Sequence, residues 1–269
     1  MIFAPRSWPS RPAFAITTRI LGATDGQYRN VKLTVIGSSP AWPNPGGIQS
    51  GYIVEGAGRL LLDCGPGVLA ELRRREPWPT VDAIAVTHFH LDHVGDLVAW
   101  LWGHLMGPAR GMPRTPLWLP PGGTAQLTSL AEPMQGAFAI SEYEAGETFD
   151  VAGYQITASA LAHFDERAYG LRITDGRSTL AYSGDTGPTP ALIELARDAD
   201  LFLCEATLAE PEQGPRGHLT ADEALAAAAE ARPRRLLLTH RAVELPVPDG
   251  CELAYDGLEV VLDPVSDPV

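Results

Sequence analysis

The chain has 269 residues, 45% of them hydrophobic, so it is long enough to bury a full core as one large domain or two small ones. It carries 33 acidic and 20 basic residues, and the formal net charge of −13 argues against loose binding to long nucleic acids. The sequence contains no run of about 18 apolar residues, which excludes a membrane-spanning helix and a membrane partner.

Residues 1–30 are expected to form an irregular N-terminal extension, with one strand-like stretch at Ala15–Leu21, and residues 31–269 one domain. After the extension, short apolar runs alternate with turn signals, as is typical of successive strands and helices. Gly56-Ala57-Gly58 predicts a hairpin between two of the strands. The expected strands are Lys32–Ile36, Gly51–Glu55, Arg59–Asp63, Ala83–Val86 and Leu117–Leu119, and the expected helices are Gly67–Arg75, Gly95–Leu105 and one that starts near Gly123.

The second half of the chain repeats this alternation of strands and helices. Thr220 and Glu223 form a capping box, which marks the start of an alanine-rich helix. The stretch Glu132–Asp150 is acidic and is assigned to no regular element. The expected strands are Ile156–Ala162, Tyr169–Thr174, Thr179–Tyr182, Leu201–Cys204 and Arg235–Thr239, with closing strands in Cys251–Leu262, and the expected helices are Pro190–Arg197 and Thr220–Ala231.

Three cysteines lie far apart, each in or beside an apolar segment. This spacing favours buried free thiols over disulfides and over CxxC metal sites. Prolines interrupt residues 1–16, which therefore do not resemble a secretory signal. Together these features predict a cytoplasmic protein. The cysteines are Cys64, Cys204 and Cys251.

Residues 87–96 read THFHLDHVGD, which places three histidines and an aspartate within six positions. Imidazole is the commonest metal ligand near neutral pH, and carboxylate is the oxygen ligand that suits zinc, manganese or iron. A tight loop after a strand aims His88 and His90 at one ion, while Asp92 and His93 point towards a second. The segment therefore predicts a metal site.

Four side chains cannot complete two coordination shells, so further ligands are needed. His163 and His240 each follow an apolar, strand-like run, and Asp185 lies in a Ser-Gly-Asp-Thr-Gly segment that follows another. His218 lies beside a polar turn. His104 falls near the end of a predicted helix, where an imidazole complements the helix dipole and caps carbonyl groups, so we interpret it as structural.

This set resembles the metallo-β-lactamase superfamily, whose HxHxDH signature matches residues 88–93 in order. His163, Asp185 and His240 fill the places of the family's later ligands, and Leu61–Gly65 looks like its second motif. The resemblance covers most of the chain, from about residue 32 to residue 262. It implies an α/β fold, the αββα four-layer sandwich, and a single metallo-β-lactamase-like hydrolase domain over residues 31–269.

By this resemblance the site binds two divalent metal ions, zinc first, with manganese or iron as alternatives. The ions would share a bridging hydroxide, whose lowered pKa makes it a nucleophile near neutral pH. Asp185 would bridge the two ions, and Asp92 would also orient the hydroxide. The resemblance assigns His88, His90 and His163 to one ion and Asp92, His93 and His240 to the other.

Two further motifs resemble the ribonuclease Z-like phosphodiesterase branch of this family: Leu203–Thr207, which contains Glu205, and Gly217–Ala221, which contains His218. In that branch the glutamate and the histidine form a hydrogen-bonded pair near the metals. Cleavage of a phosphodiester releases an alkoxide, and a histidine held protonated by a carboxylate supplies the proton. In the alternative interpretation Glu205 caps the next helix and His218 is a surface residue.

The tRNA-processing members of the branch carry a long arm that grips the tRNA, and the stretch between Leu130 and His163 has no room for one. The chain looks closest to small bacterial phosphodiesterases that act on cyclic nucleotides. We therefore expect a cyclic nucleotide or another small phosphodiester as substrate, and not long nucleic acid. Arg172 or Arg241 would contact its phosphate, unless both are ordinary surface residues. A ribonuclease Z-type tRNA 3′ endonuclease, a lactone or ester hydrolase of the same fold, and a homodimer stay open as alternatives.

Overall fold

The structure, a computed structural model, describes residues 30–262. The strand-like stretch expected at Ala15–Leu21, and all but the last residue of the expected extension, lie outside this range. Within residues 30–262, no helix has the length and the apolar character needed to cross a membrane.

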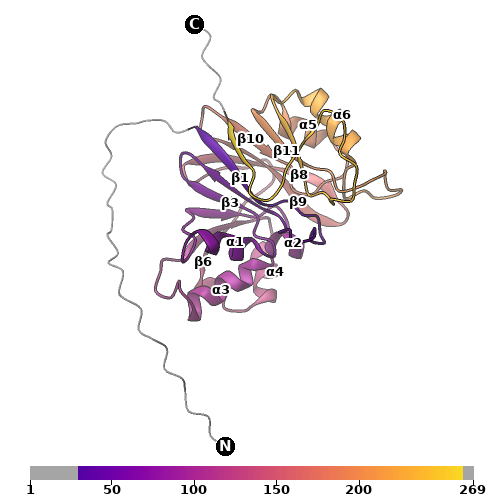
Figure 1. The fold of residues 1–269 in the computed structure, drawn as a ribbon. Helices are drawn as coiled ribbons and strands as arrows, with labels where there is room; N and C mark the ends of the chain where they lie inside the picture. The colour runs from indigo at the N-terminus through magenta and orange to yellow at the C-terminus, as the bar shows by residue number, and fades with distance from the viewer. Residues whose placement is uncertain (1–29, 263–269) are drawn as a thin grey trace, which may run out of the picture.

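Two seven-stranded sheets pack face to face, with helices on the outer face of each, so the molecule has four layers (Figure 1). This arrangement confirms the αββα sandwich. The strands of the first sheet are, in spatial order, β14 (Glu259–Leu262), β1 (Val31–Gly37), β2 (Gly51–Glu55), β3 (Arg59–Leu62), β4 (Ala83–Ala85), β5 (Thr115–Leu119) and β6 (Phe138–Glu142). Those of the second sheet are β13 (Glu252–Leu253), β12 (Leu236–Thr239), β11 (Leu201–Glu205), β10 (Thr179–Tyr182), β9 (Glu166–Thr174), β8 (Tyr154–His163) and β7 (Thr148–Val151).

Three apolar clusters hold the layers together. The central one lies between the sheets, where Leu33 and Leu60 of the first sheet and Leu171 and Leu203 of the second are fully buried. Burial of each such side chain stabilises the fold by about 1.5–3 kcal/mol. The two outer clusters lie under the helices, which are α1 (Val68–Arg75), α3 (Asp96–Met106) and α4 (Gly123–Leu130) on the first sheet and α5 (Pro190–Ala196) and α6 (Ala221–Ala231) on the second.

The direction of the strands determines where the polar residues meet. In the second sheet β10, β11 and β12 are parallel to one another, and β8 runs the same way because both β8 and β10 are antiparallel to β9. The carboxyl ends of these four strands therefore lie at one edge of the sheet. In the first sheet β3 and β4 are also parallel, so the residues that follow them leave the sheet together.

Most expected elements are present with ends shifted by a few residues. The hairpin around Gly56–Gly58 joins β2 to β3, and the capping box is confirmed: Thr220 Oγ1 accepts a bond from the Glu223 N–H at 3.3 Å, and Glu223 Oε2 accepts one from the Thr220 N–H at 2.9 Å. The described cysteines are free, as expected. Four regular segments were not expected: the single turn α2 (Leu91–Val94) inside the metal-ligand segment, and a 3-10 turn at Met134–Gly136 and the strands β6 and β7, which lie in or overlap the acidic stretch.

Candidate metal centre

The first group of candidate ligands consists of His88, His90, His163 and Asp185. Their ligand atoms all lie within 4.8 Å of one another. His90 Nδ1 is 3.2 Å from His88 Nε2 and 2.9 Å from His163 Nε2. His88 follows β4, whereas His163 is the last residue of β8, so the two sheets each contribute to this group.

The second group consists of Asp92, His93, Asp185 and His240, whose ligand atoms also lie within 4.8 Å of one another. His240 Nε2 is 3.1 Å from Asp92 Oδ2, and His93 Nε2 is 3.2 Å from Asp185 Oδ1. Asp92 and His93 lie in α2, where the helical turn directs them away from His90. Asp185 belongs to both groups, as a bridging carboxylate must.

The unsatisfied atoms at the centre of the cluster test whether metal ions fit there. His93 Nε2 and Asp185 Oδ1 are both buried and have no hydrogen-bond partner. Buried polar atoms without a partner are rare in folded proteins, and a cation between them would satisfy both. Imidazole nitrogens with carboxylate oxygens are a donor set that suits zinc, manganese or iron. The residues present therefore fit divalent metal ions.

The buried carboxylate of Asp63 orients His93 from behind. Asp63 Oδ2 accepts a hydrogen bond from His93 Nδ1 at 2.8 Å and another from the Tyr182 hydroxyl at 2.8 Å, and Oδ1 accepts one from the Thr87 N–H at 2.8 Å. A carboxylate in this position fixes the tautomer of a metal-binding imidazole, so that Nε2 faces the metal. The chain turns sharply here, because Asp63 has a φ of 55° directly after β3.

His163 and His240 are also oriented from behind. His163 Nδ1 donates to the carbonyl oxygen of Gly217 at 2.6 Å, and His240 Nδ1 lies 2.8 Å from Thr207 Oγ1. Gly184 allows the loop before Asp185 to approach the first sheet, because a Cβ at this residue would lie 2.9 Å from Thr87 Cβ. Both sheets are therefore in close contact at the cluster.

Burial and mutual charge set the protonation of the cluster. Burial holds the pKa of His88 well below its ordinary value and lowers that of His163, which leaves both imidazoles neutral, the form that binds metals. Burial alone would raise the pKa of Asp185, but His240 and His93 outweigh it and hold that carboxyl well below its usual range. Burial alone would lower the pKa of His93, but Asp185 and Asp63 raise it well above its ordinary value.

His218 and Glu205 form the expected pair beside this cluster. His218 Nδ1 donates to Glu205 Oε1 at 2.8 Å, and it lies 3.9 Å from Asp185 Oδ2. Burial opposes the charge on His218, but the hydrogen bond to Glu205 and the nearby Asp185 raise its pKa to about 9. His218 is 14% exposed, and Glu205, which ends β11, is fully buried. Because Nδ1 faces Glu205, Nε2 is the ring nitrogen that remains for a substrate.

Glu205 does more than hold His218. Its carboxylate also accepts bonds from the backbone N–H groups of Thr186 at 2.9 Å and Thr207 at 3.1 Å, and from that of Leu219 at 3.3 Å. The cap of α6 is Thr220, so Glu205 is not the residue that caps this helix. Instead the carboxylate joins the loops that carry Asp185, Thr207 and His218.

Arg172, Arg241 and His104 were also singled out from the sequence, and none of them belongs to either ligand group. Arg172 is in β9 and donates to the carbonyl of Leu195, and Arg241 donates to the carbonyls of Ala206 and Pro246, so both guanidinium groups bind backbone. His104 is in the last turn of α3, as expected, and its interaction with the helix dipole stays a prediction. Burial lowers its pKa, and its ring packs against Trp78 at 5.8 Å.

The supporting residues Asp63, Thr87, Tyr182 and Thr207 were assigned no role from the sequence. Asp63 and Thr207 lie within motifs that were noticed, and Thr87 immediately precedes His88. The sequence signal for Asp63, Thr87 and Thr207 is a polar residue at the end of a buried strand, next to a ligand in sequence or in a neighbouring strand. Tyr182 carries no such signal, because its contact with Asp63 depends on the packing of the two sheets.

Comparisons with known proteins agree with this geometry. The profile of the β-lactamase superfamily domain matches residues 58–241. An uncharacterized protein of Mycobacterium leprae is 36% identical over 230 residues, which cover 81% of this chain and 80% of that protein. Ribonuclease Z of Myxococcus xanthus is 30% identical, over 78% of this chain and 86% of its own length.

A solved structure gives the same result for the fold. The metallo-β-lactamase fold protein YhfI of Bacillus subtilis superposes with a TM-score of 0.77 at 26% identity, covering 86% of this chain and 99% of its own. The profile match alone spans more than half of the chain. The chain therefore belongs to the β-lactamase superfamily, as a hydrolase with the metallo-β-lactamase fold.

Proposed function

We propose that this hydrolase is a phosphodiesterase that uses two divalent metal ions, zinc first, with manganese or iron as alternatives, to cleave a cyclic nucleotide or another small phosphodiester. The observation that carries the proposal is the hydrogen bond between His218 and Glu205, placed 3.9 Å from the carboxylate shared by both ligand groups. A protonated histidine beside a metal centre suits a reaction that releases an alkoxide.

The candidate ligands would be shared between two metal ions. His88, His90 and His163 would hold one ion, and Asp92, His93 and His240 the other, with Asp185 bridging them. When bound, the two ions would supply Lewis acidity towards the phosphate and would lower the pKa of a water molecule towards neutrality. Asp92 is the candidate for orienting this water, because its Oδ2 lies between His93 Nε2 at 3.3 Å and His240 Nε2 at 3.1 Å.

His218 would act on the leaving group. Its Nδ1 proton is held by Glu205, and its Nε2–H is free to protonate the departing oxygen as the phosphorus–oxygen bond breaks. The raised pKa of His218, about 9, keeps the ring protonated at neutral pH. In the net reaction one water is consumed and one phosphorus–oxygen bond is cleaved. A cyclic phosphodiester gives a single product that carries both the phosphate monoester and the freed hydroxyl, and an acyclic one gives a phosphate monoester and an alcohol.

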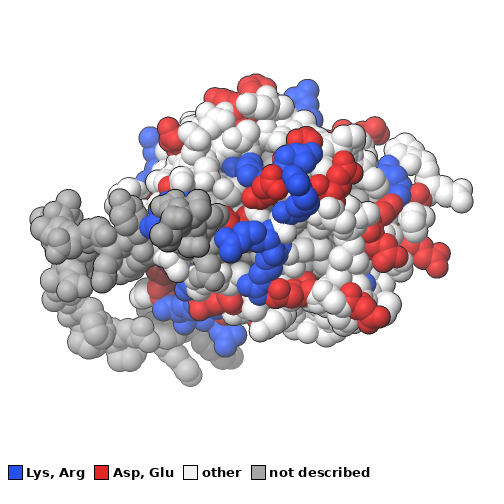
Figure 2. Space-filling view, turned by 90° about the horizontal axis from the view of Figure 1, so that it is seen from above, with Lys and Arg blue, Asp and Glu red and all other residues white. Residues whose placement is uncertain are grey.

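Charge and chain length support a small substrate. The stretch between α4 and β8 consists of short elements, β6, β7 and one 3-10 turn at Met134–Gly136, which leaves no long arm within the described residues. On the face of the molecule seen in Figure 2, a short run of neighbouring basic side chains is bordered by acidic ones. With a net charge of −13, these features disfavour a long polyanion.

Ribonuclease Z activity is the second candidate function, and the 30% identity to the Myxococcus xanthus enzyme supports it. A lactone or ester hydrolase of the same fold is disfavoured by the His218–Glu205 pair, because the family resemblance implies that such enzymes generally lack this pair. We place the enzyme in the cytoplasm, since its described cysteines are free thiols.

Metal analysis followed by a substrate panel tests the proposal. The panel contains bis-p-nitrophenyl phosphate, 2′,3′- and 3′,5′-cyclic nucleotides, a precursor tRNA, a lactone and nitrocefin. We expect two metal ions per chain, and hydrolysis of a cyclic or model phosphodiester but not of the other substrates. Accurate trimming of precursor tRNA at low enzyme concentration would favour the ribonuclease. Turnover of the lactone or nitrocefin alone would reject phosphodiester chemistry.

A further inference from the structure

A large aromatic residue occupies a position in the site where the backbone favours glycine. Phe164 and Asp165 form the two-residue turn between β8 and β9, since His163 pairs with Glu166 across the hairpin. Phe164 has a φ of 48°, and the usual residues at such a position in a short hairpin are glycine, asparagine and aspartate. A bulky side chain is strained there, and strained positions of this kind cluster at binding sites.

The ring of Phe164 lies next to the reacting groups. Its centroid is 5.2 Å from that of His163, a candidate metal ligand, and 5.7 Å from that of His218. It packs on the backbone at Gly217, where a Cβ would lie only 2.1 Å from Phe164 Cε2. The absence of a side chain at Gly217 therefore allows the ring to sit beside the proposed general acid.

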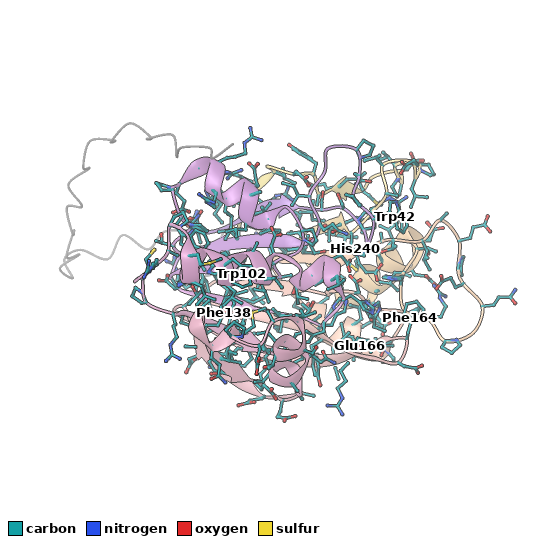
Figure 3. The ribbon with its side chains drawn as sticks, turned by 90° about the horizontal axis from the view of Figure 1, so that it is seen from below. Trp42, Trp102, Phe138, Phe164, Glu166 and His240 are labelled. Atoms are coloured by element: carbon teal, nitrogen blue, oxygen red, sulfur yellow. The ribbon has the colours of Figure 1, made fainter. Side chains whose placement is uncertain are left out.

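The ring is also accessible. Phe164 is 49% exposed, although burial of an aromatic side chain is favourable. Leu91, between the candidate ligands His90 and Asp92, is 62% exposed, and Trp42 in the loop after β1 is 53% exposed. Figure 3 shows Trp42 and Phe164 at the same end of the molecule, on either side of His240. Apolar side chains thus lie at the surface near a polar metal centre.

We infer that Phe164 is a stacking platform for a flat aromatic group of the substrate, the base of a nucleotide. The inference rests on the proposed phosphodiesterase function and specifies its substrate: a phosphodiester that carries a base. A base stacked on an aromatic side chain contributes a factor of about 5 to 150 in affinity, and stacking accepts any base. Phe164 would determine specificity and would take no part in the bond-breaking step.

The experiment compares two substrates that differ only in the base: adenosine 3′,5′-cyclic phosphate and the 3′,5′-cyclic phosphate of 1-O-methylribose. Metal-loaded wild type, Phe164→Ala, Phe164→Trp and Trp102→Ala are measured with both. Trp102 is a matched control, because it is 46% exposed but lies on α3, in a surface hollow that contains none of the candidate ligands. Equilibrium binding of AMP to each metal-loaded protein gives a readout that requires no turnover, and thermal unfolding and metal content are recorded.

We expect Phe164→Ala to raise KM for the adenosine compound about tenfold and to weaken AMP binding by a similar factor, with kcat, metal content and the abasic substrate little changed. The Phe164→Trp variant should bind AMP about as tightly as wild type, and Trp102→Ala should behave as wild type. Equal losses on both substrates, or loss of metal in Phe164→Ala, would mean that the ring only positions His163 or His218, and would overturn the inference.

The two proposals fail in different ways. If wild type hydrolyses both cyclic phosphates and Phe164→Ala affects neither selectively, the stacking role is rejected and the phosphodiesterase stands. If wild type hydrolyses no phosphodiester of the substrate panel but binds AMP in a manner that depends on Phe164, the stacking role stands and the phosphodiesterase is rejected. If wild type neither hydrolyses any phosphodiester of the panel nor binds AMP, both proposals are rejected.

Discussion

The Tyr182 hydroxyl donates a 2.8 Å hydrogen bond to the carboxylate of Asp63, and this buried contact joins the two sheets directly behind the metal centre. Tyr182 ends β10 of the second sheet, whereas Asp63 follows β3 of the first. The same carboxylate oxygen accepts a bond from His93. The orientation of a candidate ligand thus depends on how the two sheets pack.

Replacing Asp63 with asparagine should weaken metal binding. All the groups around the carboxylate are donors, so an amide NH₂ would face at least one of them, and His93 would lose its charged partner. Changes of this kind behind a metal ligand typically reduce metal affinity about 10- to 100-fold. Competition with a chromophoric chelator measures the affinity. Tyr182→Phe, which removes only one donor, is the graded control and should lose less; an unchanged affinity in Asp63→Asn would show that His93 does not bind metal.

Asp185→Asn should lower the metal content towards one ion per chain or less. Asp185 is the residue common to both ligand groups, so its loss removes the candidate bridge. Elemental analysis after gel filtration gives the stoichiometry. Asp198→Asn is the matched control, because that carboxylate is exposed, pairs with Arg232 and belongs to neither ligand group. Two tightly bound ions in Asp185→Asn would reject the bridging role.

His218→Ala should reduce kcat by about 10²–10⁴ on a cyclic nucleotide, whose ribose hydroxyl is a poor leaving group, and leave the metal content unchanged. On bis-p-nitrophenyl phosphate the loss should be smaller, because p-nitrophenolate leaves without a proton. Equal losses on both substrates would remove the general-acid role. Loss of metal would instead make His218 a ligand, as its place in a third group with Glu205 and His240 allows.

Glu205→Gln should reproduce the activity loss of His218→Ala more weakly, and the double variant should be far from additive because the pair acts as a unit. Both oxygens of Glu205 also accept backbone N–H bonds, so the variant should be less stable as well. Activity is therefore compared per folded, metal-loaded molecule, determined from thermal unfolding and metal content. Additive effects would indicate that the two residues act independently.

His104→Phe should make the free energy of unfolding less dependent on pH. Burial lowers the pKa of His104 in the native protein, whereas the unfolded chain takes up this proton near the ordinary value of 6.5. Native stability is therefore full above that pH and falls as the pH decreases below it. Urea unfolding of both proteins from pH 7.5 to 5, with a chelator present, measures the difference. Parallel curves would show that the pKa of His104 is the same in the native and the unfolded protein, and would reject this prediction.

The ligand residues were predictable because their chemistry is concentrated. Three histidines and an aspartate within six positions have few structural explanations, and His163, Asp185 and His240 each follow a buried strand. The parallel strands of the second sheet then bring their carboxyl ends together, which explains why residues 55 positions apart, such as Asp185 and His240, meet. The supporting contact of Tyr182 was not predictable, since it depends on the spacing between the two sheets.

The elements that were missed have a physical explanation. β6 and β7 are edge strands, and their half-exposed sequences mix apolar residues with Glu142 and Asp150, so that the whole stretch is dominated by charge. α2 is a single turn of four residues, too short for helical periodicity to show. The turn at Phe164 was also missed, because no sequence pattern predicts a phenylalanine with positive φ.

Each of the two sheets has two edge strands, and every edge strand carries a carboxylate. In the spatial order given above, the four edges are β14, β6, β13 and β7, and they contain Glu259, Glu142, Glu252 and Asp150 respectively. A second copy that paired with such an edge would have to remove these charged side chains from water, including the ion pairs of Glu259 with Lys32 and of Glu252 with Arg235, so growth of one continuous sheet through several copies is opposed. Any self-association should therefore use another surface, and this protection against aggregation should weaken near the isoelectric pH of about 4.9.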